Sequence, residues 1–155
     1  MNKFMNEALK EAKKAYKKLE VPVGAVIVKD GEIISKAHNL RETKLSPVAH
    51  AEILCIEKAC KKLKTWRLDG MEMYVTLEPC PMCAGALIQS RIKKIYIGAK
   101  DIKNGCVGSV CNLLDENFTH KIEYEYLEGS EECSKILSNF FKELRTLKKK
   151  EKEKE

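Results

Sequence analysis

The residues best suited to chemistry fall in two short segments, His50-Ala51-Glu52 and Pro79-Cys80-Pro81-Met82-Cys83. Cys80 and Cys83 are three positions apart, so on a helix their side chains share a face and can hold one ion. Zinc prefers thiolate and imidazole ligands, and His50 is the natural third ligand. The two segments therefore predict one zinc ion per chain, bound by His50, Cys80 and Cys83.

Three protein ligands leave one position on zinc for water, which is the pattern of catalytic rather than structural zinc sites. Zinc lowers the pKa of that water towards about 7 and makes hydroxide available. Glu52 then acts as a proton shuttle and not as a ligand. His50 and Glu52 lie about 200° apart on an ideal helix, so both can face one ion only if His50 is in the first, irregular turn.

Two other readings of the cysteine motif have to be weighed. A Cys-x-x-Cys pair can be a redox centre, but the sequence around Cys80 and Cys83 lacks the thioredoxin-like context that such a centre requires. A structural zinc site would need a fourth ligand, and the sequence leaves several candidates open: Cys55, Cys60, Cys106, Cys111, Cys133, His38 and His120.

The elements that must position these residues follow from the apolar spacing and the turn residues. Apolar residues recur every three or four positions from Phe4 to Leu19, which predicts a helix ended by Pro22. Strands are expected at Val23–Val28 and Glu32–Ala37, paired antiparallel through a tight turn at Asp30-Gly31. Ser46-Pro47 predicts the N-cap and first turn of a second helix.

The second helix is expected to run through Leu63. Further along, strands and helices alternate, with a strand at Met71–Leu77, a helix from Pro79 to about Ser90, strands at Lys94–Ile97 and Ile122–Tyr126, and a helix at Ser130–Lys150. A hairpin followed by such alternation predicts a mixed sheet with helices on both faces. Both zinc-binding segments then lie at helix N-termini, whose positive ends favour thiolate.

Length and composition indicate one domain and an intracellular setting. The chain has 155 residues, 44% of them hydrophobic, which fits a single domain over residues 1–150 and a charged tail over 151–155. No stretch approaches the roughly 20 apolar residues that span a bilayer, and Met1–Glu20 lacks the apolar block of a secretory signal. Seven cysteines, an odd number, argue against a disulfide framework and for the cytoplasm.

Joined together, His-x-Glu and Pro-Cys-x-x-Cys form the signature of zinc nucleobase deaminases. The chain resembles the bacterial tRNA-specific adenosine deaminases of the cytidine deaminase superfamily. The resemblance extends over most of the chain, through residues 21–25, 37–42, 66–68, 74–78, 83–86, 90–92, 98–99, 105–106, 108–109, 112–114 and 140–141. Cytosine and guanine deaminases share the zinc motifs, whereas Asn39-Leu40-Arg41-Glu42 and Phe140-Phe141 favour the tRNA enzymes.

This resemblance implies a three-layer α/β/α fold around a five-stranded mixed sheet, and a homodimer. The implied reaction is hydrolytic deamination of adenosine to inosine at the wobble position of a tRNA anticodon. His50, Cys80 and Cys83 match the zinc ligands of that family, and Glu52 matches its proton shuttle.

The resemblance also implies residues that contact the substrate. Asn39 matches an asparagine that hydrogen-bonds the flipped base, and Val23 matches a wall of its pocket. Asp101 and Lys103 fall in a loop near the anticodon, where the family usually has Asp-Pro-Lys and this chain has Ile102.

The net charge of +6 permits an RNA partner. Basic residues gather in Arg91–Lys103 and in Phe140–Lys150, where they can contact phosphates, and aromatic side chains beside them can stack on unpaired bases. Phe140 and Arg145 are therefore candidate contacts for the anticodon stem-loop. Of Phe140 and Phe141, one is expected in the core and the other partly exposed.

Two alternative functions remain at this stage. A deaminase of free guanine, or of cytosine or its nucleoside, would share every zinc residue without needing a basic surface. A zinc-stabilised RNA-binding protein that has lost catalysis is a different class of protein. The presence of Glu52, a carboxylate that is not a ligand, argues against the inactive protein.

Overall fold

Strand β1 (Gly24–Lys29) lies inside a five-stranded sheet and is buried on both faces along most of its length. The other strands are β2 (Glu32–His38), β3 (Glu72–Leu77), β4 (Lys94–Ala99) and β5 (Glu123–Tyr126). Their order in the sheet is β2-β1-β3-β4-β5. β1 pairs antiparallel with β2 and β3, whereas β3, β4 and β5 run parallel, so the predicted mixed sheet is confirmed.

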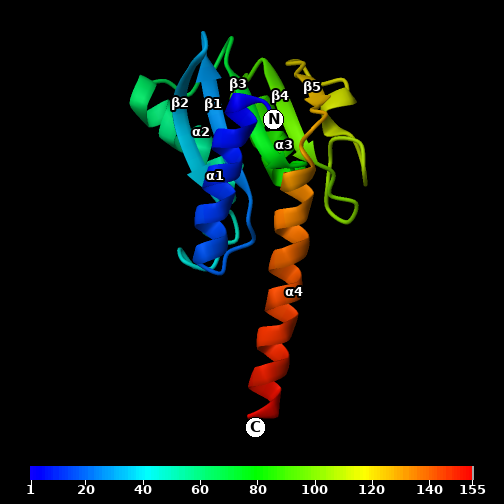
Figure 1. Ribbon diagram of the computed structural model, residues 1–155. Coiled ribbons are helices and arrows are strands. Elements are labelled where there is room, and N and C mark those ends of the chain that lie inside the picture. Colours follow the sequence, from blue (N-terminus) through cyan, green and yellow to red (C-terminus); the bar gives the residue numbers. More distant parts are fainter. Residues whose placement is uncertain (155) are drawn as a thin grey trace.

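Helices cover both faces of this sheet in the computed structural model, which describes residues 1–154 (Figure 1). One face carries α1 (Lys3–Lys17) and α4 (Glu131–Glu153), and the other carries α2 (Ala51–Leu63) and α3 (Pro81–Gln89). Alternate residues of β1 serve the two layers: Val26 packs with the α1 side and Ile27 with the α2–α3 side. The predicted three-layer α/β/α fold is therefore confirmed.

Three helix starts or ends differ from the sequence-based expectation. The helix α1 ends at Lys17, and Leu19 then adopts a left-handed backbone conformation, φ 59°, before Pro22 is reached. The helix α2 begins at Ala51 rather than at Pro47, because the residues before it form turns. The helix α3 begins at Pro81 rather than at Pro79, since the Pro79 carbonyl accepts a hydrogen bond from the backbone of Cys106 instead of starting the helix.

The helix α4 continues to Glu153, three residues beyond its expected end, and its C-terminal half projects well past the rest of the molecule (Figure 1). Phe141 and Leu147 of this helix are 40% and 42% exposed, whereas Phe140 packs against Tyr16 of α1. The expected tail over 151–155 is thus helical through Glu153, while Glu155 lies outside the described residues. Within residues 1–154, no helix is both long and apolar enough to cross a membrane.

Candidate zinc and catalytic site

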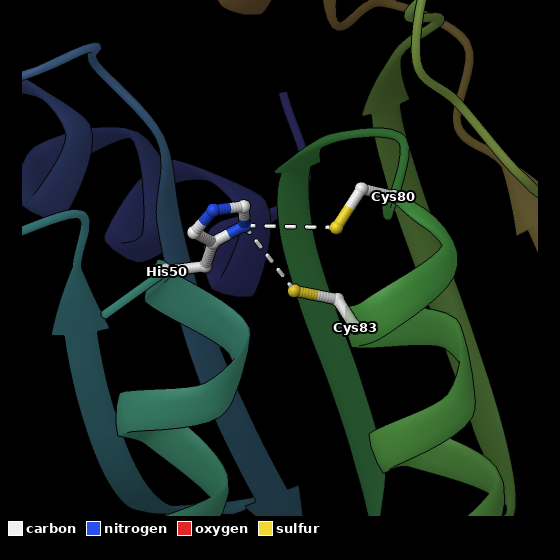
Figure 2. Close-up of side chains that lie close together, drawn as sticks. All are labelled: His50, Cys80 and Cys83. Atoms are coloured by element: carbon white, nitrogen blue, oxygen red, sulfur yellow. Dashed lines mark hydrogen bonds between the residues drawn. The ribbon is translucent and has the colours of Figure 1, made fainter. Parts of the chain in front are cut away.

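His50, Cys80 and Cys83 converge from the N-termini of two neighbouring helices (Figure 2). His50 is the N-cap residue of α2 and Cys80 is the N-cap residue of α3, both with extended backbone, and Cys83 lies in the first turn of α3. His50 Nδ1 is 3.6 Å from Cys80 Sγ and 3.5 Å from Cys83 Sγ. The expected position of both segments at helix starts is confirmed, with His50 just outside its helix rather than within its first turn.

The separation of these three atoms fits zinc. Zn–N bonds of about 2.0–2.1 Å and Zn–S bonds of about 2.3 Å, in tetrahedral arrangement, place nitrogen and sulfur about 3.6 Å apart. Both nitrogen–sulfur distances agree with this value. One imidazole and two thiols are also the ligand types that zinc prefers.

Among residues 1–154, no other His, Cys, Asp or Glu joins this group within ligand distance. Cys106 and Cys111, open candidates for a fourth ligand, instead form a disulfide with each other. The odd cysteine count argued against a disulfide framework; the structure has this bridge between cysteines five positions apart and leaves five other cysteines free. The remaining cysteines carry free thiols, and Cys55 and Cys133 are buried away from the site.

The protonation of the two cysteines is shaped by their contact with each other. A hydrogen bond from Cys83, with a further contribution from His50, lowers the pKa of Cys80 to about 4 against the opposing effect of burial. The same contact, together with burial, raises the pKa of Cys83. The hydrogen bond to Cys80 raises the pKa of His50. The cluster therefore carries negative charge on sulfur, which favours a bound cation.

Glu52 lies in the first turn of α2 and is only 4% exposed. Burial raises the pKa of its carboxyl to about 7, the nearby Cys80 sulfur raises it too, and contacts with His50 and Cys83 oppose the change. A carboxyl with such a pKa can both accept and donate a proton near neutral pH. Its place beside all three ligands suits a proton-transfer group.

Asn39 follows strand β2 and is almost fully buried. Its side-chain amide donates to the Val21 carbonyl at 3.2 Å, and its side-chain oxygen accepts from the Arg41 backbone at 3.1 Å. Its own backbone N–H donates to the carbonyl of Val23, the expected pocket wall, which is 9% exposed. Asn39 and Val23 are thus fixed to each other through the backbone.

Two buried carboxylates to which no sequence motif assigned a role, Glu20 and Glu78, hold loops near the site. Glu20, 1% exposed, accepts hydrogen bonds from the backbone of Glu42 and from the backbone and hydroxyl of Thr43. Glu78 holds the loop that contains Asp101 in the same manner. The available signal was an acidic residue directly before, or two positions before, a proline at the boundary of an apolar strand.

The remaining candidate contacts lie on the surface or in the core. Lys103 and Arg145 are exposed, and the Asp101 side chain accepts from the backbone N–H of Lys103 at 3.2 Å. Phe140 is only 3% exposed and packs edge-on against Tyr16 of α1, so in this structure it serves the core and not base stacking. Phe141 is 40% exposed, so of this pair one phenylalanine lies in the core and the other is partly exposed, as expected.

Comparisons with known proteins agree with this geometry. A profile of the MafB19-like deaminases matches residues 1–145. The tRNA-specific adenosine deaminase of Bacillus subtilis (strain 168) is 58% identical over 147 residues, covering 94% of this chain and 91% of that protein. A solved structure from work on A-to-I editing by tRNA:A34 deaminases at the wobble position of transfer RNA superposes with a TM-score of 0.82, at 41% identity over 86% of this chain and 98% of that chain. A guanine deaminase from Bacillus subtilis superposes less well, with a TM-score of 0.62 at 33% identity over 77% of this chain and 88% of that chain.

Proposed function

The chain belongs to the MafB19-like deaminase family, and we propose that it is a zinc-dependent hydrolase that converts adenosine to inosine at the wobble position of a tRNA anticodon. The observation that carries the proposal is the buried Glu52 beside the cluster of His50, Cys80 and Cys83. The 58% identity of the chain to a protein named tRNA-specific adenosine deaminase supports the choice of substrate.

His50, Cys80 and Cys83 would hold one zinc ion per chain. Bound there, zinc supplies a Lewis acid that lowers the pKa of water towards about 7. Glu52 takes a proton from the attacking water and delivers it to the base, so that adenosine and water give inosine and ammonia. The burial of Glu52 keeps this proton away from bulk solvent between the two transfers.

The choice of base has to come from residues other than the metal ligands. Asn39 is held rigidly by hydrogen bonds on both ends of its side-chain amide. We propose that it hydrogen-bonds the extruded adenine, with Val23 forming an apolar wall of the pocket. An anticodon loop presents bases that are already unstacked, which lowers the cost of extruding one of them.

The basic surface supplies the proposed contacts to the rest of the RNA. Lys103 lies exposed on the loop after β4, and Arg145 lies on the projecting half of α4 (Figure 1). Lys148, Lys149 and Lys150 continue the same helix. We propose that these side chains contact phosphates of the anticodon stem-loop, while Asp101 orders the loop that carries Lys103.

We also propose a homodimer, formed through the outer face of α2 and α3. Trp66 is 58% exposed beside Ile56, Cys60 and Ala86, which together leave an apolar hollow on this face. A second copy would cover it. A tRNA substrate would place the enzyme, a single domain over residues 1–150, in the cytoplasm.

A panel of substrates tests the proposed function. Zinc-loaded protein is incubated separately with an unmodified tRNA transcript that carries adenosine at the wobble position, and with free adenosine, cytidine, cytosine and guanine. We expect inosine in the tRNA and little ammonia from the small molecules. Efficient release of ammonia from guanine or cytosine, with no inosine in the tRNA, would instead support the free-base deaminase.

A further inference from the structure

The loop over residues 101–109 is built around one buried carboxylate, that of Glu78, which directly follows strand β3 and lies two positions before Cys80, a proposed zinc ligand. Glu78 is only 2% exposed. Its Oε1 accepts from the backbone N–H of Asp101 at 3.0 Å and from the hydroxyl of Ser109. Its Oε2 accepts from the backbone N–H of Val107 at 3.0 Å and of Ser109 at 3.1 Å. Both oxygens are thus used entirely to hold this loop.

The packing at Gly105 shows how closely the loop wraps the carboxylate. A Cβ atom added at Gly105 would lie 2.2 Å from Glu78 Cδ and 2.5 Å from the Asp101 carbonyl oxygen, so only glycine fits. The backbone of Cys106 also donates to the carbonyl of Pro79, directly before Cys80. The loop over residues 101–109 and the segment that contains Cys80 are therefore connected directly.

We propose that Glu78 is a positioning residue for the substrate: its carboxylate sets the loop with Asp101 and Lys103 at a fixed place relative to the zinc ligands. The inference rests on the proposed function for the identity of the substrate. Four donors on two oxygens fix the loop more firmly than one contact would, because hydrogen bonds to a charged group are the strong ones. The contacts proposed for Lys103 on this loop are to phosphates and not to the reacting carbon, so a misplaced loop weakens substrate binding more than it slows the chemical step.

The first experiment compares the kinetics of zinc-loaded Glu78→Gln and the unaltered protein on an anticodon stem-loop RNA. Glutamine keeps one acceptor oxygen but points an NH₂ group at two donors of the loop. We expect KM to rise about tenfold, with a much smaller change in kcat and with zinc still bound. Ser109→Ala, which removes one donor, should raise KM less, and the double variant should behave like Glu78→Gln alone.

A purely structural role predicts a different pattern. Unfolded molecules are inactive and lower the concentration of active enzyme, so the apparent kcat falls while KM stays constant. Leu68→Ala provides this control, because it truncates the fully buried side chain of a residue whose backbone N–H donates to the Ser90 carbonyl, at the opposite end of α3. Should Glu78→Gln fail to fold, Ser109→Ala is compared instead with Ser90→Ala, which removes a buried hydroxyl from that same distant end.

Amide hydrogen exchange without RNA separates failure of this inference from failure of the proposed function. We expect Glu78→Gln to lose protection at Asp101, Val107 and Ser109, while amides of β1 remain protected. Unchanged protection at these three amides, or an unchanged KM in a variant that lacks the carboxylate or the Ser109 hydroxyl, overturns the proposal. If the unaltered protein deaminates no RNA, the substrate assignment fails. The positioning role for that substrate then fails as well, whatever the exchange pattern shows.

Discussion

At the scale of single residues, the zinc content of the protein should depend on each of the three proposed ligands, His50, Cys80 and Cys83. Cys83 is fully buried, and Cys83→Ser replaces this proposed zinc ligand with a hydroxyl that binds zinc poorly. Because metal binding and folding are coupled, we expect this variant to lose zinc and to unfold at a lower temperature. Zinc analysis and thermal denaturation measure both effects.

A matched control for this variant is Cys133→Ser, which alters another buried free cysteine, on α4. That protein should keep its zinc. Full zinc occupancy in Cys83→Ser would show that the ligand assignment is wrong.

Glu52 is the second residue whose role can be tested alone. Glu52→Gln keeps the size and hydrogen-bonding capacity of the side chain but cannot carry a proton. General acid–base groups contribute about 10²–10⁴-fold to the rate, so we expect kcat to fall by at least about that factor with zinc and fold retained. Glu57→Gln, on the exposed face of the same helix, should have normal activity. Near-normal turnover by Glu52→Gln would assign the proton transfer to another group.

At the scale of elements, the loop between β2 and α2 depends on the buried Glu20 carboxylate. Burial alone raises the pKa of Glu20, but hydrogen bonds from Thr43 and Glu42 outweigh this effect and lower it below its ordinary value. A carboxyl with a lowered pKa stabilises the folded state at pH values above its unfolded pKa, and this contribution is lost as the pH falls through the folded pKa.

We therefore expect Glu20→Gln to lower the free energy of unfolding at pH 7 by about 1–3 kcal/mol. The difference from the unaltered protein should shrink below about pH 4.5, as the carboxyl becomes protonated. Urea denaturation at a series of pH values measures it, with exposed Glu32→Gln as the control. If the difference in the free energy of unfolding stays constant from pH 7 to well below pH 4.5, this role for Glu20 is wrong.

The elements also show what the sequence can and cannot predict. Within residues 1–154, apolar spacing and turn residues predicted every strand and all four α-helices, and ligand chemistry predicted that His50, Cys80 and Cys83 come together, because both depend on local patterns. The predicted starts of α2 and α3 were wrong. Pro47 and Pro79 both favour a first helical turn, but the residues before α2 form local turns, and the Pro79 carbonyl accepts a hydrogen bond from the backbone of Cys106. The Cys106–Cys111 bond was not predicted, because the turn at Gly108, φ 119°, that brings the two cysteines together has no clear pattern in the sequence.

At the scale of the whole molecule, the projecting half of α4 carries exposed basic residues, Arg145 and Lys148 to Lys150. Removing residues 145–155 deletes Arg145 and the lysines that follow it without disturbing buried residues of this helix, which are Cys133 and Phe140. We expect zinc to be retained and RNA binding to weaken. The affinity should also depend less on salt, because each lost phosphate contact reduces the slope of log affinity against log salt by about 0.7–0.9.

Binding titrations at several salt concentrations test this prediction. Lys61→Gln with Lys62→Gln, at the far end of α2 from His50, is the control for charge alone. An unchanged salt slope in the truncated protein would place the RNA-binding surface elsewhere.

The most direct test of the central claim is position-resolved mapping of inosine in an anticodon stem-loop that contains adenosine both at the wobble position and elsewhere in the loop. The account predicts that zinc-loaded protein forms inosine at the wobble position alone, and that the Glu52→Gln protein forms none. The absence of inosine from the wobble position after incubation with zinc-loaded, folded protein would contradict it.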